Sequence, residues 1–307
     1  MKLLQILIHN IMPLAVMIGT GMLVQRKFGL DIRTLSKLTF YLFSPAVIFK
    51  MLYEAQLTYE FMFQVLAFFA VFIVLLYGAA EIVIRLRRYQ GGMPGAFRNS
   101  VIFYNSNNYG LPLNQLVFGG NPYTMAVQII IMMMMNVLPF TYGIYSVNAH
   151  RMSLRQSLRQ IAAMPVIYVI PAAFLLKWTN VAVPEPIYIP INYLADGFLA
   201  VALLTLGVQL ASIKWNIRGD VLLSSFLRLC IAPALGALVV WAMGIRGEMA
   251  AALILSCAVP TSLTSSLLAV EFGNEPEFAS QAVLVSTALS LVTIAAVIYV
   301  LGYVFGI

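Results

Sequence analysis

Ten apolar stretches, each about as long as a membrane-crossing helix, follow one another along the chain with short polar connections between them. A helix needs roughly 20 apolar residues to cross a hydrocarbon core of about 30 Å. Only 9% of the residues are charged and 62% are hydrophobic, whereas about 25% of the residues of an ordinary soluble domain are charged. The sequence therefore predicts an all-α membrane protein with ten transmembrane helices. The stretches are residues 4–25, 35–53, 61–84, 96–118, 123–147, 158–177, 188–211, 221–243, 249–270 and 278–303.

Lysine and arginine gather on alternate connections between these stretches. Because basic residues near helix ends resist translocation, the side that carries most of them faces the cytoplasm. We therefore expect a multi-pass protein of the inner or plasma membrane, with both chain termini facing away from the cytoplasm. The basic residues assigned to the cytoplasmic side are Arg26, Lys27, Arg33, Lys37, Arg85, Arg87, Arg88, Arg98, Arg151, Arg155, Arg159, Lys214 and Arg218, against Lys2, Lys50, Lys177 and Arg246 on the outer side.

Other classes of function find little support in the composition. The net charge of +7 is dispersed over helix ends instead of forming one basic stripe, so no nucleic-acid partner is expected. Cys230 and Cys257 are too few for a disulfide framework or a metal site. An intramembrane enzyme would need a nucleophile beside a base, and the apolar stretches hold few titratable groups. We expect no enzyme activity, no cofactor and no metal.

Two of the apolar stretches are interrupted by short polar segments that contain glycine or proline. The first interruption runs from Asn105 to Pro112 and the second from Cys257 to Ser262. A broken helix at membrane depth leaves backbone N–H and C=O groups unpaired, which is tolerated where the backbone lines a wet cavity or a ligand site. We interpret the two interruptions as two halves of one binding site. Gly110 and Pro112 would start a new half-helix in the first, and Pro260 would do so in the second.

The two interrupted stretches are followed by similar turns. Residues 118–122 read Phe-Gly-Gly-Asn-Pro and residues 272–276 read Phe-Gly-Asn-Glu-Pro, about half the chain later. Internal repeats of this kind are typical of membrane carriers. The chain thus divides into a first five-helix repeat, residues 1–150, and a second, residues 151–307. Since five crossings are an odd number, the second repeat enters the membrane from the opposite side, and the repeat is inverted.

Several motifs resemble those of a known transporter family, and they lie along essentially the whole chain. The family is that of the auxin efflux carriers, which includes the plant PIN proteins and bacterial malate and malonate carriers. Its glycine-rich segment ending in Gly-Leu-Pro-Leu is similar to Asn108–Leu113 here. The further similar segments are Leu204–Leu210, Arg228 with Pro233, and Pro260 with Glu271-Phe272-Gly273.

The resemblance implies a bile-acid-symporter-like, PIN-like fold in which the fourth and ninth helices cross as broken pairs. Helices one, two, six and seven would form a scaffold, through which a homodimer would assemble, and the remaining helices would move. The chain departs from the family at Asn105 to Asn108, where many relatives are rich in glycine, and at residues 261–266, where small apolar residues are commoner.

The residues around the two interruptions favour an anion. A new half-helix presents unpaired N–H groups and the positive end of its dipole. Asn105, Asn107 and Asn108 add amide groups to the first interruption, and Thr261 and Ser262 add hydroxyls to the second. We predict that these five residues bind substrate. The alternative is that the hydroxyls bond to helix carbonyls or pack between helices.

Arg228 and Asp196 are charged residues placed deep in predicted spans. Such a position costs roughly 2.5 to 3.5 kcal/mol on insertion scales, so each needs a compensating partner. Arg228 would bind a substrate carboxylate, or else pair with Asp196 or helix carbonyls, or reach an interface. Asp196 is a candidate for coupling transport to an ion.

Together these observations predict a secondary carrier that moves a small organic anion of the carboxylate class by alternating access. No nucleotide-binding loop is present. An anion leaving a cell that is negative inside gains about 2.3 kcal/mol per charge per 100 mV, which favours export. The alternatives are a sodium- or proton-coupled importer of the same fold and a ligand sensor that does not transport.

Overall fold

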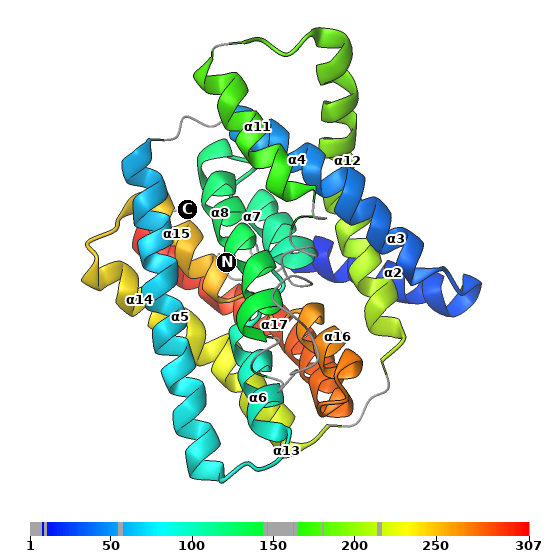
Figure 1. Cartoon of the computed structure of the whole chain (residues 1–307), viewed down its shortest axis with the longest axis vertical. Helices are drawn as coiled ribbons and strands as arrows, with labels where there is room; N and C mark the ends of the chain where they lie inside the picture. Colours follow the sequence, from blue (N-terminus) through cyan, green and yellow to red (C-terminus); the bar gives the residue numbers. More distant parts are fainter. Residues whose placement is uncertain are drawn as a thin grey trace.

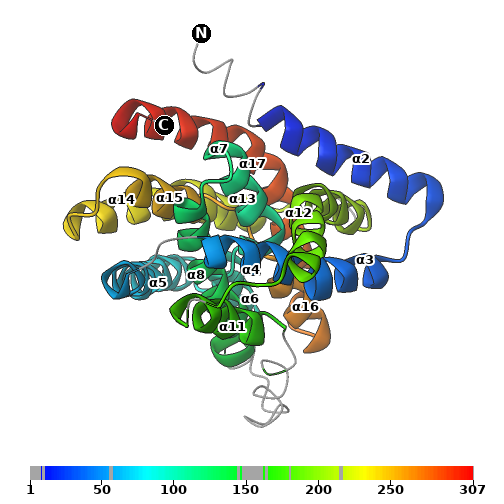
Figure 2. The same ribbon diagram turned by 90° about the horizontal axis from the view of Figure 1, so that it is seen from above.

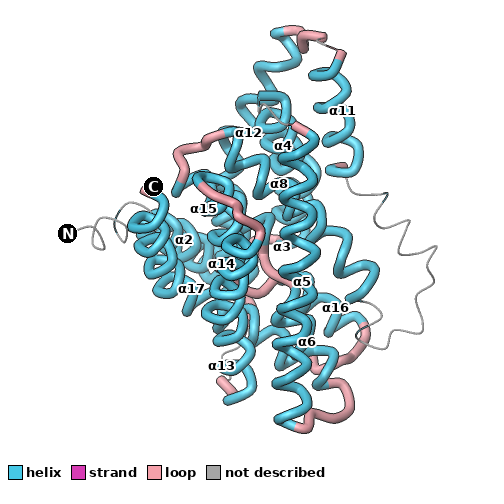
Figure 3. Tube along the Cα trace, turned by 90° about the vertical axis from the view of Figure 1, so that its left-hand side faces the viewer, coloured by secondary structure: helices cyan, strands magenta, loops and turns pink. Residues whose placement is uncertain are grey.

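A computed structural model describes residues 8, 11–54, 58–143, 146, 162, 165–179, 181–213 and 217–306. Within these residues the regular structure is helical (Figure 3), apart from an isolated antiparallel bridge between Tyr104 and Thr261. Some helices continue through π-helical turns, labelled η. The elements are α2 (Met12–Phe28), α3 (Ile32–Leu38), η2 (Thr39–Phe43), α4 (Ser44–Glu54), α5 (Tyr59–Arg87), α6 (Met93–Ile102), η3 (Ser106–Gly110), α7 (Leu111–Val117), α8 (Pro122–Leu138), η4 (Pro139–Gly143), α11 (Val166–Trp178), α12 (Glu185–Ala211), α13 (Gly219–Phe226), η5 (Leu227–Ile231), α14 (Ala232–Ala242), α15 (Gly247–Cys257), α16 (Leu263–Glu271) and α17 (Pro276–Phe305).

Five helical segments among the described residues are long and apolar enough to cross a membrane: Thr34–Glu54, Tyr59–Arg87, Glu185–Ala211, Gly219–Ala242 and Pro276–Phe305. Large apolar side chains such as Phe63, Val74 and Trp241 are exposed on their outer faces, as expected where lipid is the solvent. These observations agree with the predicted all-α, multi-pass membrane protein. The predicted boundary between the two repeats, after residue 150, falls within residues 147–161. These residues lie outside the described part of the chain.

The ends of the long helices follow local sequence signals. The Thr58 hydroxyl accepts a hydrogen bond from the N–H of Phe61, 3.2 Å away, and so caps α5. Asn121 caps α8 in the same way through Tyr123, and Pro122 follows at the first helical position. At its other end α5 stops at Arg88, which adopts a left-handed backbone conformation. Local sequence signals therefore set the start of α5 and of α8 and the end of α5.

The helices fall into two groups (Figures 1 and 2). The first, which we call the scaffold group, consists of α2, α3, η2, α4, α11 and α12, with α12 packed on α2 and α4, and α11 packed on α4. The second, the crossing group, consists of α5 to η4 and α13 to α17, in which α14 packs on α15, and α17 on α13 and α16. The scaffold group therefore comprises the first, second, sixth and seventh predicted spans.

The α2–α12 pair is the closest helix contact of the scaffold group. A Cβ atom added at Gly21 would lie 2.3 Å from the Leu204 carbonyl oxygen, and one added at Gly207 would lie 2.0 Å from the Ile18 carbonyl oxygen. The two glycines therefore bring the backbones into direct contact, as small residues do between membrane helices.

Candidate functional site

The two predicted interruptions are present, and they lie against each other. Helix α6 ends at Ile102 and α15 ends at Cys257, and the segment that follows each helix is non-helical. The N–H of Asn105 donates to the Pro260 carbonyl at 2.8 Å, and the N–H of Ser262 donates to the Phe103 carbonyl at 2.8 Å. Each break therefore supplies acceptors for the backbone donors of the other, which is what backbone exposed at membrane depth requires.

Thr261 holds the crossing together from within. Its hydroxyl donates to the Ser100 carbonyl at 2.8 Å, and its N–H donates to the Ser286 hydroxyl at 3.1 Å. The residue is fully buried and does not line the cavity described below. The structure thus places Thr261 in the alternative position considered for the hydroxyl residues, on a helix carbonyl.

The chain becomes helical again after each break, with Pro112 in the first turn of α7 and Pro260 before the start of α16. After the first break the helix resumes at Ser106 as the π-helical turn η3, so Pro112 lies inside a continuing helix. The wider turn accommodates a residue that has no N–H to donate. Gly110 lies in close contact with α8, since a Cβ atom there would lie 2.4 Å from Gln128 Nε2. That amide nitrogen donates to the Ser106 hydroxyl at 2.7 Å.

After the second break α16 begins at Leu263, so the expectation that Pro260 would start the new half-helix is wrong. Pro260 lies in the extended segment, where its carbonyl accepts the bond from Asn105. Ser262 caps α16 instead, with its hydroxyl accepting from the N–H of Thr264 at 3.2 Å. A serine can cap because its side chain accepts, whereas proline has no such group.

A cavity of about 180 Å³ lies where the second half-helices begin, between the two groups of helices. Of the residues predicted to bind substrate, Asn105, Asn107, Asn108 and Ser262 line it. Its lining residues are Ser36, Tyr104, Asn105, Ser106, Asn107, Asn108, Met135, Asn136, Gln209, Ser262, Leu263, Thr264 and Leu267. Ser36 and Gln209 come from the scaffold group, and the others come from the crossing group.

The polar side chains of the cavity are only partly satisfied. Asn105 is 6% exposed, its Oδ1 accepts from the N–H of Asn108 at 3.2 Å, and its Nδ2 has no acceptor among the described residues. Asn107 accepts from the Ser44 hydroxyl at 3.0 Å and donates to Asn108 Oδ1 at 3.1 Å. A buried donor without an acceptor is costly. Asn105 Nδ2 is therefore a buried donor beside the cavity that still lacks an acceptor.

The residues that line this cavity include no charged side chain. Positive potential comes instead from the N-terminal ends of the helix formed by η3 and α7 and of α16, each equivalent to roughly half an elementary charge. These two ends, with the amide groups of the asparagines, form a site suited to a small anion.

Arg228 does not line the cavity. Its guanidinium is fully buried and donates through Nη1 to the Val101 carbonyl at 3.0 Å and through Nη2 to the Cys257 carbonyl. Of the roles considered from the sequence, binding to helix carbonyls is the one that these contacts describe.

Asp196 also lies outside the cavity. Its Oδ1 forms an ion pair with Lys50 Nζ at 3.0 Å, within the scaffold group, and its side chain is 69% exposed. The pair explains how Lys50, assigned to a helix end, is compensated in the scaffold.

Sequence reasoning missed Ser36, Asn136 and Gln209 among the residues of the cavity. Gln209 belongs to the segment Leu204–Leu210 that resembles the transporter family, but nothing in the sequence shows which face of α12 meets the break. Its Nε2 donates to the Ser36 hydroxyl at 2.9 Å, and its buried Oε1 has no partner among the described residues. This wall of the cavity is visible only once the two groups are packed together.

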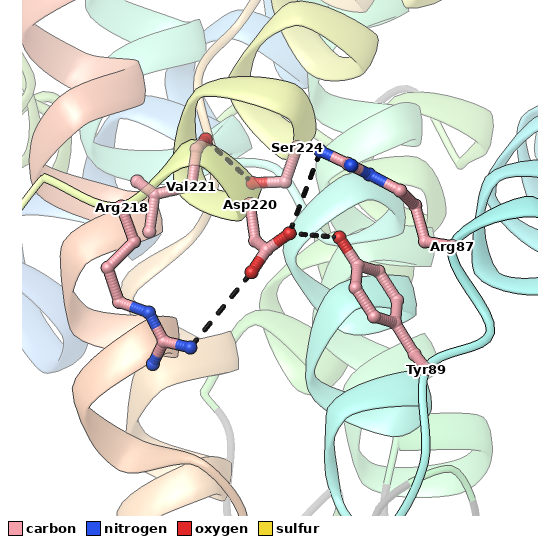
Figure 4. A network of polar contacts seen from close by, with 6 residues as sticks. All are labelled: Arg87, Tyr89, Arg218, Asp220, Val221 and Ser224. Atoms are coloured by element: carbon pink, nitrogen blue, oxygen red, sulfur yellow. Dashed lines mark hydrogen bonds and ion pairs between the residues drawn. The ribbon is translucent and has the colours of Figure 1, made fainter.

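Two charged clusters lie at the end of the crossing group, away from the cavity. Asp220, at the start of α13, accepts from the Tyr89 hydroxyl at 2.6 Å and lies 4.0 Å from Arg87 and from Arg218 (Figure 4). Burial is the largest cause that raises the pKa of Tyr89, and the hydrogen bond to Asp220 is the next. The phenol therefore stays protonated and continues to donate. Arg98 and Glu81 form the second cluster, an ion pair between α6 and α5. Both clusters tie neighbouring helices of the crossing group together.

A larger hollow of about 700 Å³ lies between α14, α15 and α17, but its lining is mostly apolar, as Pro233, Trp241 and Val297 illustrate, with Arg246 and Thr293 as polar members. It offers an anion few groups to bind. The smaller cavity at the crossing is therefore the candidate site.

Comparison with known proteins agrees with this geometry. A family model described as "Membrane transport protein" matches residues 148–298. The chain is 34% identical over 86 residues to "Probable auxin efflux carrier component 5b" of Oryza sativa subsp. japonica, which is 28% of this chain and 23% of the rice protein. It is 24% identical over 190 residues to "Uncharacterized transporter YfdV" of Escherichia coli strain K12, which is 60% of each chain. The matches thus span less than two thirds of the length of either relative. With the crossed helix breaks and the motifs that surround them, these matches support a membrane transporter of the auxin efflux carrier family.

Proposed function

We propose that the protein is a secondary carrier that exports a small organic anion of the carboxylate class by alternating access. The observation that supports this most is the cavity between the two groups of helices, where two helix N-terminal ends and an unpaired asparagine amide converge. A site between two packed bodies can open to either side when one body moves against the other. The scaffold group would stay fixed while the crossing group moves.

The size of the cavity supports a small substrate. Water occupies about 30 Å³ per molecule in the liquid, so a space of about 180 Å³ holds about six water molecules. A carboxylate with a few carbon atoms fills a similar volume, whereas a drug-sized ligand needs a pocket of about 300 Å³ or more.

The proposal includes an inverted repeat of two five-helix halves, and contacts at the two turns support it. Asn121, after the first broken helix, donates to Glu248 at the start of α15 at 3.0 Å. Asn274, after the second, packs on the start of α6, where a Cβ atom at Gly92 would lie 1.9 Å from Asn274 Oδ1. Each turn thus meets the beginning of the other broken helix. A homodimer through the scaffold group and termini outside the cytoplasm remain predictions from the sequence.

The proposal is tested by measuring carboxylate binding and flux in the purified protein. Thermal unfolding is first followed with a series of mono- and dicarboxylates, and efflux of the best ligand is then measured from proteoliposomes with an imposed potential. Binding together with potential-driven flux is expected. Flux that requires sodium or a proton gradient would indicate the coupled importer, binding without flux would indicate a sensor, and absence of binding would overturn the proposal.

Asn105→Asp is the sharpest variant for the site. Aspartate retains the oxygen that accepts from Asn108, so the start of the second half-helix is preserved, but it places a negative charge where the free amide lies. Like charges a few ångströms apart repel, so carboxylate affinity should fall about tenfold or more. Gln90→Glu makes the same chemical change at an exposed loop residue and should leave affinity unchanged. Equal affinities in the two variants would exclude this cavity as the binding site.

A further inference from the structure

The crossing brings four helix ends into one small region. Helices α6 and α15 arrive there with their C-terminal ends, while the helix of η3 and α7 and helix α16 leave with their N-terminal ends. A C-terminal end is equivalent to roughly −0.5 elementary charge and an N-terminal end to roughly +0.5. Without a further charge, the two negative ends would offset the two positive ones, and the cavity would attract an anion only weakly.

Arg228 binds both negative ends at once. Val101 and Cys257, whose carbonyls accept from its two terminal nitrogens, are in the last turn of α6 and at the last position of α15. A guanidinium suits this task because its planar fork presents parallel donors and its charge persists when it is buried. The residue reaches the crossing from the π-helical turn η5 of the span formed by α13 and α14.

Tyr104 lies between Arg228 and the cavity. The guanidinium carbon is 4.6 Å from the centre of the Tyr104 ring, and Tyr104 itself lines the cavity. Arg228 therefore does not touch a ligand there, and it can influence one only through its charge and through the helix ends that it holds.

We propose that Arg228 is a positioning residue whose charge neutralises the C-terminal ends of α6 and α15, so that the N-terminal ends of the second half-helices dominate the potential in the cavity. The role in anion binding rests on the proposed function, but the electrostatic claim does not. It can be measured without any substrate.

A thiol in the cavity reports this potential directly. Thr264→Cys places it in the first turn of α16, in a Cys230→Ser background, since Cys257 is fully buried. Only the thiolate reacts with iodoacetamide, and a positive potential favours the thiolate. Adding Arg228→Gln should slow alkylation at neutral pH on the order of tenfold, the effect of one unit charge about 10 Å away at an effective dielectric constant of about 20.

Arg228→Lys separates charge from shape, because lysine retains the charge but not the fork. It should react within about twofold of the parent. Arg246→Gln removes an exposed arginine at the start of α15, the opposite end of that helix from the crossing, and should match the parent. Equal slowing by the lysine and glutamine variants, or no slowing by either, overturns the proposal. If Arg228→Gln does not fold, the lysine variant decides. An alkylation rate within about twofold of the parent then supports the role of the charge, and slowing of about tenfold overturns it.

Carboxylate binding supplies a separate readout. Arg228→Gln should lower the affinity for the carboxylate found by the thermal screen about tenfold, while the affinity for its uncharged amide analogue changes little. A parent protein that binds no carboxylate yet shows the alkylation pattern would reject the proposed function and retain the role of Arg228. Carboxylate binding with an unchanged alkylation pattern would do the reverse.

Discussion

Two contacts in the molecule differ in kind. One is the contact between α2 and α12, and the other is the contact between the two helix groups. In the first, Gly21 and Gly207 press backbone against backbone. The second contact surrounds a polar cavity, and the hydrogen bond from the Ser44 hydroxyl to Asn107 Oδ1 joins the two groups there. Close-packed surfaces have few alternative arrangements, whereas polar groups beside a wet cavity can exchange partners. We call the α2–α12 contact the rigid seam, and the contact between the two groups, where the proposed movement would take place, the moving seam.

The largest effect is expected from filling the rigid seam. Gly207→Leu would place a side chain where only a carbonyl oxygen fits, so α2 and α12 must separate. Overpacking of this kind costs about 1–3 kcal/mol and sometimes more. The melting temperature of the purified protein should fall clearly. Gly19→Leu is the matched control, since a Cβ atom at Gly19 has no neighbour within 4 Å. Equal melting temperatures for the two variants would mean that the seam is not rigid.

A cross-link between the scaffold group and the crossing group, across the moving seam, should affect stability less but transport strongly. Cysteines at Ser44 and Asn107, in the Cys230→Ser background, would join the two groups when treated with a short bifunctional thiol reagent. The reagent should stop flux and leave the protein folded. Cysteines at Lys50 and Asp196 join two helices of the scaffold group and should transport equally well before and after treatment. Continued flux in the first protein after complete cross-linking would refute movement along this seam.

The smallest effect is expected at the exposed ion pair of the scaffold group. Exposed pairs contribute little to stability, and Asp196 lies outside the cavity. Asp196→Asn should therefore change carboxylate affinity less than twofold and leave any dependence of flux on sodium or pH as it was. Loss of such a dependence would identify Asp196 as the ion-coupling residue. The scaffold group would then hold part of the functional site.

The sequence predicts the places where the fold departs from simple helices, because those departures are local. Asparagines, glycines and prolines within apolar stretches mark the two breaks, and Asn105, Asn107, Asn108 and Ser262 do line the cavity. The partners of charged residues are not local. Arg228 meets carbonyls of two distant helices and Asp196 meets Lys50, and no spacing within one span encodes either pairing.

The start of the second half-helices shows a further limit. Proline favours a first helical turn, but the helix already resumes at Ser106, where Asn105 caps it by accepting from the N–H of Asn108 and Gln128 of α8 bonds the Ser106 hydroxyl. Ser36 and Gln209 complete the cavity from the scaffold group, and their contribution follows from packing between groups. A local cap thus starts the first half-helix before its proline, and tertiary contacts supply the missing wall of the cavity.

The reciprocal hydrogen bonds between the breaks also bear on how the chain is made. During synthesis the amide of Asn105 enters the bilayer long before Pro260 has left the ribosome, so its permanent acceptor does not yet exist. Until then water, lipid headgroups or the insertion machinery must satisfy it. The first half of the chain therefore stays an unfinished intermediate, and maturation is completed only when the last two helices arrive.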